Sequence, residues 1–162
     1  MGKSYHFRVI GDPKPGGSKR GFPYKDRKTG QTRVAITEDA KRNKEWRSDV
    51  KDAVIREGLH NRAMLRPPLQ LEVVFVLRRP KGHFGTGKNA SVLKPSAVHY
   101  HTTKPDATKL LRSTEDALTG LLWEDDSQIS RPIVTKRYAY IGEAPGAFIS
   151  VSELEDVGRG PW

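Results

Sequence analysis

Residues 104–129, with the sequence KPDATKLLRSTEDALTGLLWEDDSQI, decide the interpretation of this chain. They contain six carboxylates and three cations, whereas the whole chain has a net charge of +10, so the remainder sums to +13. The carboxylates are Asp106, Glu115, Asp116, Glu124, Asp125 and Asp126. A basic surface attracts a polyanion, and clustered carboxylates attract a divalent cation. This contrast is typical of metal-dependent enzymes that act on nucleic acids.

A helix is predicted to occupy the first half of this stretch. Pro105 disfavours helical geometry in its neighbourhood, and Asp106 or Thr108 then provides the cap of a new helix. Gly120 is expected to end it. One buried stripe is predicted for Leu110, Leu111, Ala117 and Leu118.

Three adjacent acids, Glu124, Asp125 and Asp126, follow the apolar anchor at Trp123. Adjacent carboxylates repel one another unless they are solvated or bound to a cation. Magnesium prefers a few carboxylates and retains several waters. Taken separately, Asp106 and the later acids are explained as a helix cap and a polar turn. Taken together in a chain this basic, they favour a magnesium site.

Composition limits the class of protein. At 162 residues, with 35% hydrophobic and 30% charged residues, the chain is expected to form one domain with a modest core. It has no cysteine, which excludes disulfides and thiolate metal sites. No apolar run reaches bilayer length, and the first ten residues lack the apolar core of a signal peptide. The pI near 9.9 favours nucleic acid over membrane as the partner.

Most of the chain before the acidic stretch is basic. Tyr5–Ile10 alternates like a strand, and the turn-rich residues 11–33 interleave cations with Phe22 and Tyr24. Such interleaving suits phosphate contact and base stacking, although a solvated loop that packs on a sheet has the same composition. The predicted DNA-binding residues are Lys14, Lys19, Arg20, Lys25, Arg27, Lys104, Lys109, Lys136 and Arg137.

The remaining elements are predicted from periodicity. A helix is expected over 37–57, a central strand covered on both faces over 69–77, and further strands over 131–140 and 147–154. Residues 79–103 are expected to form a flexible basic loop that becomes ordered on DNA. Its histidines are read as solvated side chains, because no metal-binding motif concentrates them. A frayed tail is expected over 155–162.

The acidic stretch resembles the RusA-type Holliday junction resolvases, a family common in bacteriophages and prophages. The resemblance is carried by Lys104-Pro105-Asp106, residues 110–112, residues 116–120 and Trp123 through Ile129, and it extends loosely over most of the chain. It implies a single α+β domain over residues 1–162, a two-layer α/β sandwich with a mixed sheet packed against two main helices. It also implies a homodimer that works in the cytoplasm of a bacterial host cell.

The resemblance further implies an endodeoxyribonuclease that hydrolyses branched DNA in paired cuts with Mg²⁺, or with Mn²⁺ as a substitute. Asp106 matches the first aspartate of the family's Asp-x-Asp motif. Asp125 and Asp126 match the later acidic pair, whose second member is usually the essential one. Arg112 stands where the family commonly has a catalytic lysine, and an arginine there retains the positive charge.

One departure from the family pattern affects the metal site. Thr108 replaces the second aspartate of Asp-x-Asp, and a hydroxyl is a poor substitute for a carboxylate ligand. Glu115 lies on the same helical face about two turns on, so it is expected to supply the missing carboxylate, with Asp116 as the other candidate. The alternatives are a catalytically impaired protein of the same fold that binds junctions or single strands, and an RNA-binding module.

Overall fold

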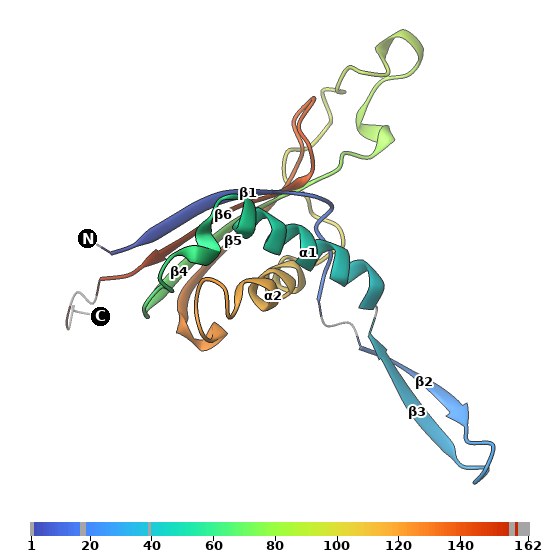
Figure 1. Cartoon of the computed structure of the whole chain (residues 1–162). Helices are drawn as coiled ribbons and strands as arrows, with labels where there is room; N and C mark the ends of the chain where they lie inside the picture. The colour runs from blue at the N-terminus through green and yellow to red at the C-terminus, as the bar shows by residue number, and fades with distance from the viewer. Residues whose placement is uncertain (1, 17–18, 39, 156–157, 159–162) are drawn as a thin grey trace.

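The computed structural model describes residues 2–16, 19–38, 40–155 and 158. Its main sheet has the strand order β1-β6-β4-β5, formed by β1 (Ser4–Ile10), β6 (Gly146–Glu153), β4 (Leu69–Leu77) and β5 (Ile129–Tyr138). β4 and β5 are parallel, and the other neighbouring pairs are antiparallel. Two helices, α1 (Ala40–Arg56) and α2 (Ala107–Leu118), pack together on one face of the sheet (Figure 1). The predicted two-layer α+β fold is confirmed.

The hydrophobic core lies between this sheet and the two helices. Alternate residues of β1 and β4 point into it, as the strand period of two requires. Its largest fully buried side chains include Trp46, Val50 and Val54 of α1 and Leu69, Leu71 and Phe75 of β4. The stripe predicted for α2 is confirmed, since Leu110, Leu111, Ala117 and Leu118 are all buried. Burying each large side chain contributes about 1.5–3 kcal/mol.

The strand predicted over residues 69–77 is confirmed as β4, which is internal to the sheet. Both main helices lie on the same face, so the other face is only partly covered. On that face Glu72 is exposed, Val74 is half-buried and Val76 is buried. The expectation of a strand covered on both faces is therefore met only toward the end of β4.

Residues 19–38 form a β-hairpin where a turn-rich loop was expected. β2 (Lys19–Lys25) pairs antiparallel with β3 (Thr32–Glu38). In the turn between them, the Asp26 carbonyl accepts from the Gly30 N–H at 2.8 Å, and the Asp26 N–H donates to the Gln31 carbonyl at 2.9 Å. Gly30 has φ of 66°, which glycine adopts without steric cost. The turn-forming residues in the sequence therefore lie beside the two strands and in the turn between them, and they do not exclude strand formation.

The hairpin also shifts the start of α1. The helix predicted from residue 37 begins at Ala40, because Thr37 and Glu38 continue β3, while Asp39 lies outside the described residues. Its predicted end is confirmed, since α1 stops at Arg56 and Gly58 follows with φ of 65°. Short 3-10 helices complete the secondary structure of the described part of the chain: η1 (Leu59–Asn61), η2 (Lys81–His83), η3 (Gly87–Asn89) and η4 (Asp126–Gln128).

Residues 79–103 form an arm that projects beyond the sheet (Figure 1). Within the arm, the Lys94 N–H donates to the His83 carbonyl at 2.9 Å. Its returning limb pairs with the edge of β5, where the Tyr138 N–H donates to the His99 carbonyl at 2.9 Å. The segment is thus hydrogen-bonded within itself and to the edge of β5, while its flexibility and its ordering on DNA stay predictions.

The last two strands are confirmed within a few residues, as β5 and β6. Of the tail predicted over residues 155–162, only residues 155 and 158 are described. In the part of the chain that the structure describes, no helix is long and apolar enough to cross a membrane.

Candidate functional site

Asp106 stands at the start of α2 with an exposed carboxylate. It is the N-cap residue, and its backbone carbonyl accepts from the Leu110 N–H at 3.1 Å, yet its side chain makes no capping hydrogen bond. The ammonium of Lys109 lies 3.4 Å from Asp106 Oδ2. The positive end of the helix dipole favours the charged carboxylate here. Among the described residues, the Asp106 side chain is held only by this exposed ion pair, which a bound cation would replace.

Asp126 lies beyond the other end of α2, and its carboxylate is fixed by two anchored donors. Oδ1 accepts from the hydroxyl of Thr119 and from Trp123 Nε1–H at 3.2 Å. Thr119 is the C-cap of α2, and Trp123 is fully buried. Partners held this firmly fix the orientation of the carboxylate, as a metal ligand requires.

Glu115 lies near Asp126 on the last turns of α2. Burial raises the pKa of the Glu115 carboxyl, and the charges of Asp126 and Asp116 raise it further, while Arg112 lowers it. The neighbouring carboxylates disfavour the ionised state of Glu115, and a divalent cation would remove this repulsion. The donor chemistry at this end of α2 therefore suits a hard cation.

The other candidate for the missing carboxylate, Asp116, is already paired. Its side chain forms an ion pair with Arg47, which connects α2 to α1. The sequence left Glu115 and Asp116 as the two candidates for the missing carboxylate ligand. Glu115 lies near the predicted ligand Asp126, whereas Asp116 is paired with Arg47.

Asp125 caps the short helix η4. Its Oδ1 accepts from the Ser127 N–H at 2.8 Å, and its own N–H donates to Gln128 Oε1 at 3.3 Å, which completes a capping box. Hydrogen bonds from the side chain and backbone of Ser127 lower the pKa of the exposed Asp125 carboxyl. These contacts match the polar turn that the sequence left as the simpler explanation for this residue.

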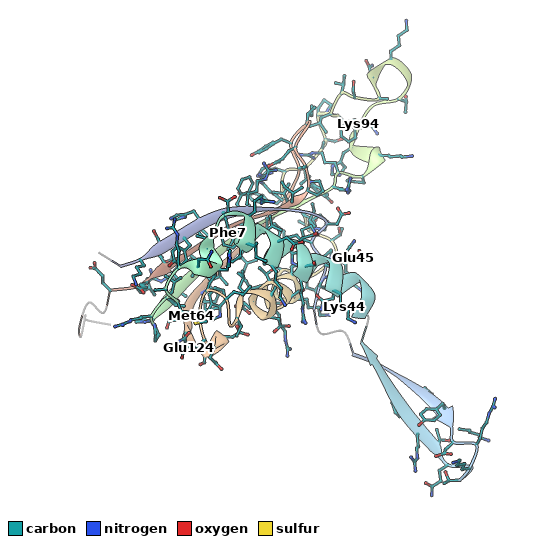
Figure 2. The ribbon with its side chains drawn as sticks, in the orientation of Figure 1. Phe7, Lys44, Glu45, Met64, Lys94 and Glu124 are labelled. Atoms are coloured by element: carbon teal, nitrogen blue, oxygen red, sulfur yellow. The ribbon has the colours of Figure 1, made fainter. Side chains whose placement is uncertain are left out.

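The carboxylates fall into two groups at opposite ends of α2. With twelve residues in α2, a rise of 1.5 Å per residue separates the ends by about 18 Å. The arm does not place Lys94 near these acids either: Figure 2 shows Lys94 far from Glu124, which lies on the turn that carries Asp125 and Asp126. Among the described residues, no group of three or more His, Asp or Glu side chains is placed to hold a metal ion. The expectation that Asp106, Asp125 and Asp126 meet around one ion is therefore not met within a single chain.

Lys136 holds the backbone that leads into α2. Its ammonium donates to the carbonyls of Thr103 at 2.8 Å and Pro105 at 2.7 Å. The half-buried side chain is thus engaged inside the fold, and the prediction that Lys136 contacts DNA is not supported. It fixes the backbone at Thr103 and Pro105, just before Asp106.

Arg137, also predicted to bind DNA, is 9% exposed. Its guanidinium makes two hydrogen bonds to Glu143, at 2.6 and 2.8 Å, and lies 4.4 Å from the ring centroid of Tyr140. Hydrogen bonds from Arg137 lower the pKa of Glu143 to about 2. Since its charge is paired with Glu143 and its side chain is buried, the geometry of Arg137 does not support the predicted DNA contact.

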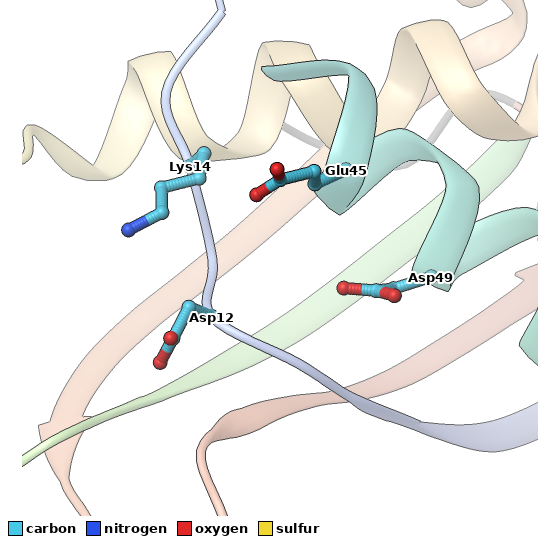
Figure 3. Close-up of a pocket in the computed structure, with 4 residues that line it drawn as sticks. All are labelled: Asp12, Lys14, Glu45 and Asp49. Atoms are coloured by element: carbon cyan, nitrogen blue, oxygen red, sulfur yellow. The ribbon is translucent and has the colours of Figure 1, made fainter. Parts of the chain in front are cut away.

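Lys14 lies in an acidic environment. It lines an open pocket of about 430 Å³ with Asp12, Glu45 and Asp49 (Figure 3). Burial raises the pKa of Asp49, and the charges of Asp52, Glu45 and Asp12 raise it further. The three carboxylates that line this pocket repel phosphate, so the pocket does not support the predicted DNA contact of Lys14.

Of the other predicted DNA-binding residues, four have exposed side chains, and the side chains of two are not described by the structure. Exposed side chains are Lys25, Arg27, Lys104 and Lys109. The side chains of Lys19 and Arg20 lie outside the described part of the chain. Arg112, the predicted catalytic cation, is exposed on α2 between the two groups of carboxylates.

Three supporting roles were not identified from the sequence. Thr119 orients Asp126, Lys136 fixes the approach to Asp106, and Arg47 pairs with Asp116. Thr119 carries a weak signal, since it is a hydroxyl residue immediately before the glycine that ends a helix. Arg47 and Lys136 are distant in sequence from their partners, and only the tertiary fold brings them together.

Comparison with known proteins gives one family. A model described as "Endodeoxyribonuclease RusA" matches residues 14–152, which include α1, α2 and every carboxylate predicted for the metal site. A comparison with curated proteins found no match to the chain.

Proposed function

Because the chain belongs to the endodeoxyribonuclease RusA family, we propose that it is a magnesium-dependent endonuclease that resolves Holliday junctions or related branched DNA by paired phosphodiester hydrolysis. The family acts on Holliday junctions, and its nucleases are metal-dependent in general. The observation that carries the proposal is the placement of Asp106 at one end of α2 and of Glu115 with Asp126 at the other, in a protein of net charge +10. Cleavage of a synthetic four-way junction with and without Mg²⁺ tests it.

A homodimer resolves the separation of the carboxylates. In a closed dimer the same surface of both subunits meets across a two-fold axis. If the two α2 helices run antiparallel across that axis, Asp106 of each subunit approaches Glu115 and Asp126 of the other. Both metal sites are then shared between subunits, and two symmetric sites match paired cuts in opposing strands.

The open edge of the main sheet along β5 is less suited to form the two-fold contact between subunits. The backbone N–H of Tyr138 and the backbone carbonyl of Lys136 form hydrogen bonds with His99 and His101, which lie outside the sheet. The backbone N–H and C=O groups of the even-numbered residues of β5 therefore point toward the open edge. Pro132 is one of them and has no N–H to donate, which disfavours the addition of another strand. The exposed surface of α2, which carries Lys109 and Arg112, is the better candidate for the two-fold contact.

Each residue of the shared site has a role set by its chemistry. Asp106, Glu115 and Asp126 would hold the cation, which when bound lowers the pKa of water and balances charge on the phosphate. Arg112, between them on α2, stabilises negative charge that develops on the phosphate in the transition state. Asp125 is retained as a weaker ligand candidate, since its described contacts serve the η4 cap.

Junction binding is expected to weaken steeply as salt rises. Each phosphate contact adds about −0.9 to the slope of log binding constant against log salt. A protein this basic, using several of its exposed cations, should show a slope of roughly −4 or steeper. Fluorescence anisotropy with labelled junction in EDTA measures it, and a flat response would exclude extensive phosphate contact.

Replacing Lys136 is expected to disturb Asp106 without affecting DNA binding. Lys136→Met keeps the length of the side chain but removes both hydrogen bonds to the backbone before Asp106. Small misplacements of a catalytic group cost about a hundredfold in rate, so single-turnover cleavage should fall by about that factor. Junction affinity in EDTA should stay within about twofold of wild type; a large loss would instead support the original DNA-contact role for Lys136.

Replacement of the family aspartate by Thr108 keeps a second function open, that of a junction- or single-strand-binding protein without catalysis. The exposed Thr108 contributes no carboxylate near Asp106. The magnesium-dependent cleavage assay separates the two, because a binding protein leaves the junction uncut in Mg²⁺ and in Mn²⁺.

A further inference from the structure

The β2–β3 hairpin stands apart from the rest of the molecule (Figure 1). Among the described residues, its two strands make extensive contacts only with each other, and neither pairs with a strand of the main sheet. A two-stranded hairpin is at best marginally stable when both of its faces are in water. An element of this kind is expected to be covered by a partner in the functional state.

The outer half of the hairpin, residues 23–34, combines positive charge with exposed apolar side chains. It has four cations and one acid: Lys25, Arg27, Lys28, Arg33 and Asp26. Tyr24 is 47% exposed and Val34 is 63% exposed. Tyr24 pairs with Arg33 across the strands, so the aromatic ring and the guanidinium share one face of the ribbon.

The turn of the hairpin is organised without the side chains of Arg27 and Lys28. Asp26 Oδ1 accepts from the backbone N–H of Lys28 at 2.8 Å, and Arg33 lies 3.4 Å from Asp26 Oδ2. The side chains of Arg27 and Lys28 are exposed at the tip, and no hydrogen bond or ion pair of either side chain is found among the described residues. They are therefore charges that the hairpin presents outward at no cost to its own turn.

We propose that this hairpin is a DNA-binding arm that lies in the major groove of one duplex limb of the branched substrate, a role that rests on the proposed function. The major groove is about 12 Å wide and admits a two-stranded ribbon, whereas the minor groove, at about 6 Å, does not. The net charge of +3 over residues 23–34 favours DNA over a second copy of the same hairpin. The arm places Arg27 and Lys28 against phosphates and Tyr24 against the groove wall.

The first experiment removes the charges at the tip. Arg27→Ala/Lys28→Ala is compared with Lys3→Ala/Arg66→Ala, which removes two exposed charges at the opposite end of the body. The Lys3 and Arg66 backbone N–H groups, which bond Glu153, remain in that control. In EDTA, the tip variant should lose about tenfold or more in affinity for a four-way junction, and its salt slope should become less steep by about 1.8. The control should match wild type. Equal behaviour of the two variants would overturn the proposal.

The second experiment locates the arm on the substrate. The chain has no cysteine, so Thr29→Cys at the tip accepts an iron chelate at a single position, and the radicals it generates cut nearby DNA. Cuts are expected within one duplex limb, away from the branch point, with the strand offset of a reagent held in the major groove. Cuts at the branch point, a minor-groove offset or no cuts at all would overturn the proposal. A change in oligomeric state when the tip cations are removed would also overturn the proposal, because it would indicate that the hairpin is exchanged between subunits.

The controls separate this inference from the proposed function. If wild-type protein neither binds nor cuts the junction, the proposed function fails. If wild type binds and cuts while the tip variant and the chelate give the contradicting results, the hairpin inference alone fails.

Discussion

Asp106→Asn is expected to abolish junction cleavage, with a rate at least about a thousandfold below wild type. The amide keeps the size of the side chain but removes a charged ligand from the proposed metal site. Junction binding in EDTA should be unchanged or tighter, because a negative charge near the phosphates is lost. The measurements are single-turnover cleavage in Mg²⁺ and anisotropy without metal.

The fold should tolerate this change. The Asp106 side chain makes no capping bond and pairs with Lys109 in an exposed ion pair, which contributes at most about 1 kcal/mol. Thermal unfolding should therefore be close to that of wild type. Asp52→Asn, an exposed acid on α1, removes the same charge and should cleave normally. Full activity of Asp106→Asn would remove this residue from the site.

Local sequence patterns predicted the body of the fold well. The period of β4 and the apolar stripes of α1 and α2 follow from burial on one side, and such patterns are readable in a short window of sequence. The hairpin was missed because its apolar alternation is short, with Phe22 and Tyr24 in β2 and Val34 and Ile36 in β3, and charged and turn-forming residues surround it. Its turn residues alone suggested a loop.

The candidate site was predictable in its residues but not in its geometry. Asp106 and Asp126 carry a clear chemical signal, yet the helix between them imposes a separation that the pattern does not reveal. Lys136 and Arg137 show the complementary problem. Both are cations on a strand, and only the fold shows that one binds backbone carbonyls and the other is buried against Glu143.

A dimer with one Asp106→Asn subunit and one Asp126→Asn subunit is expected to regain cleavage that both parent variants lack. In the proposed dimer each site takes Asp106 from one subunit and Asp126 from the other. The mixed dimer then places both substitutions in one site and leaves the second site intact. Sites contained within one chain would each carry a substitution, and the mixed dimer would be inactive.

Co-expression with two different affinity tags isolates this mixed dimer. Its nicking rate should be about half that of wild type, since one site of two is intact, and it should cut one strand without the paired cut in the opposing strand. A mixed dimer of Asp106→Asn with Lys109→Ala/Asp106→Asn is the matched control, because both sites then lack Asp106 and no activity should return. Restored nicking only in the Asp106/Asp126 combination would follow directly from the separation of these carboxylates along α2. A silent mixed dimer would place the metal within one chain and require α2 to rearrange on binding DNA.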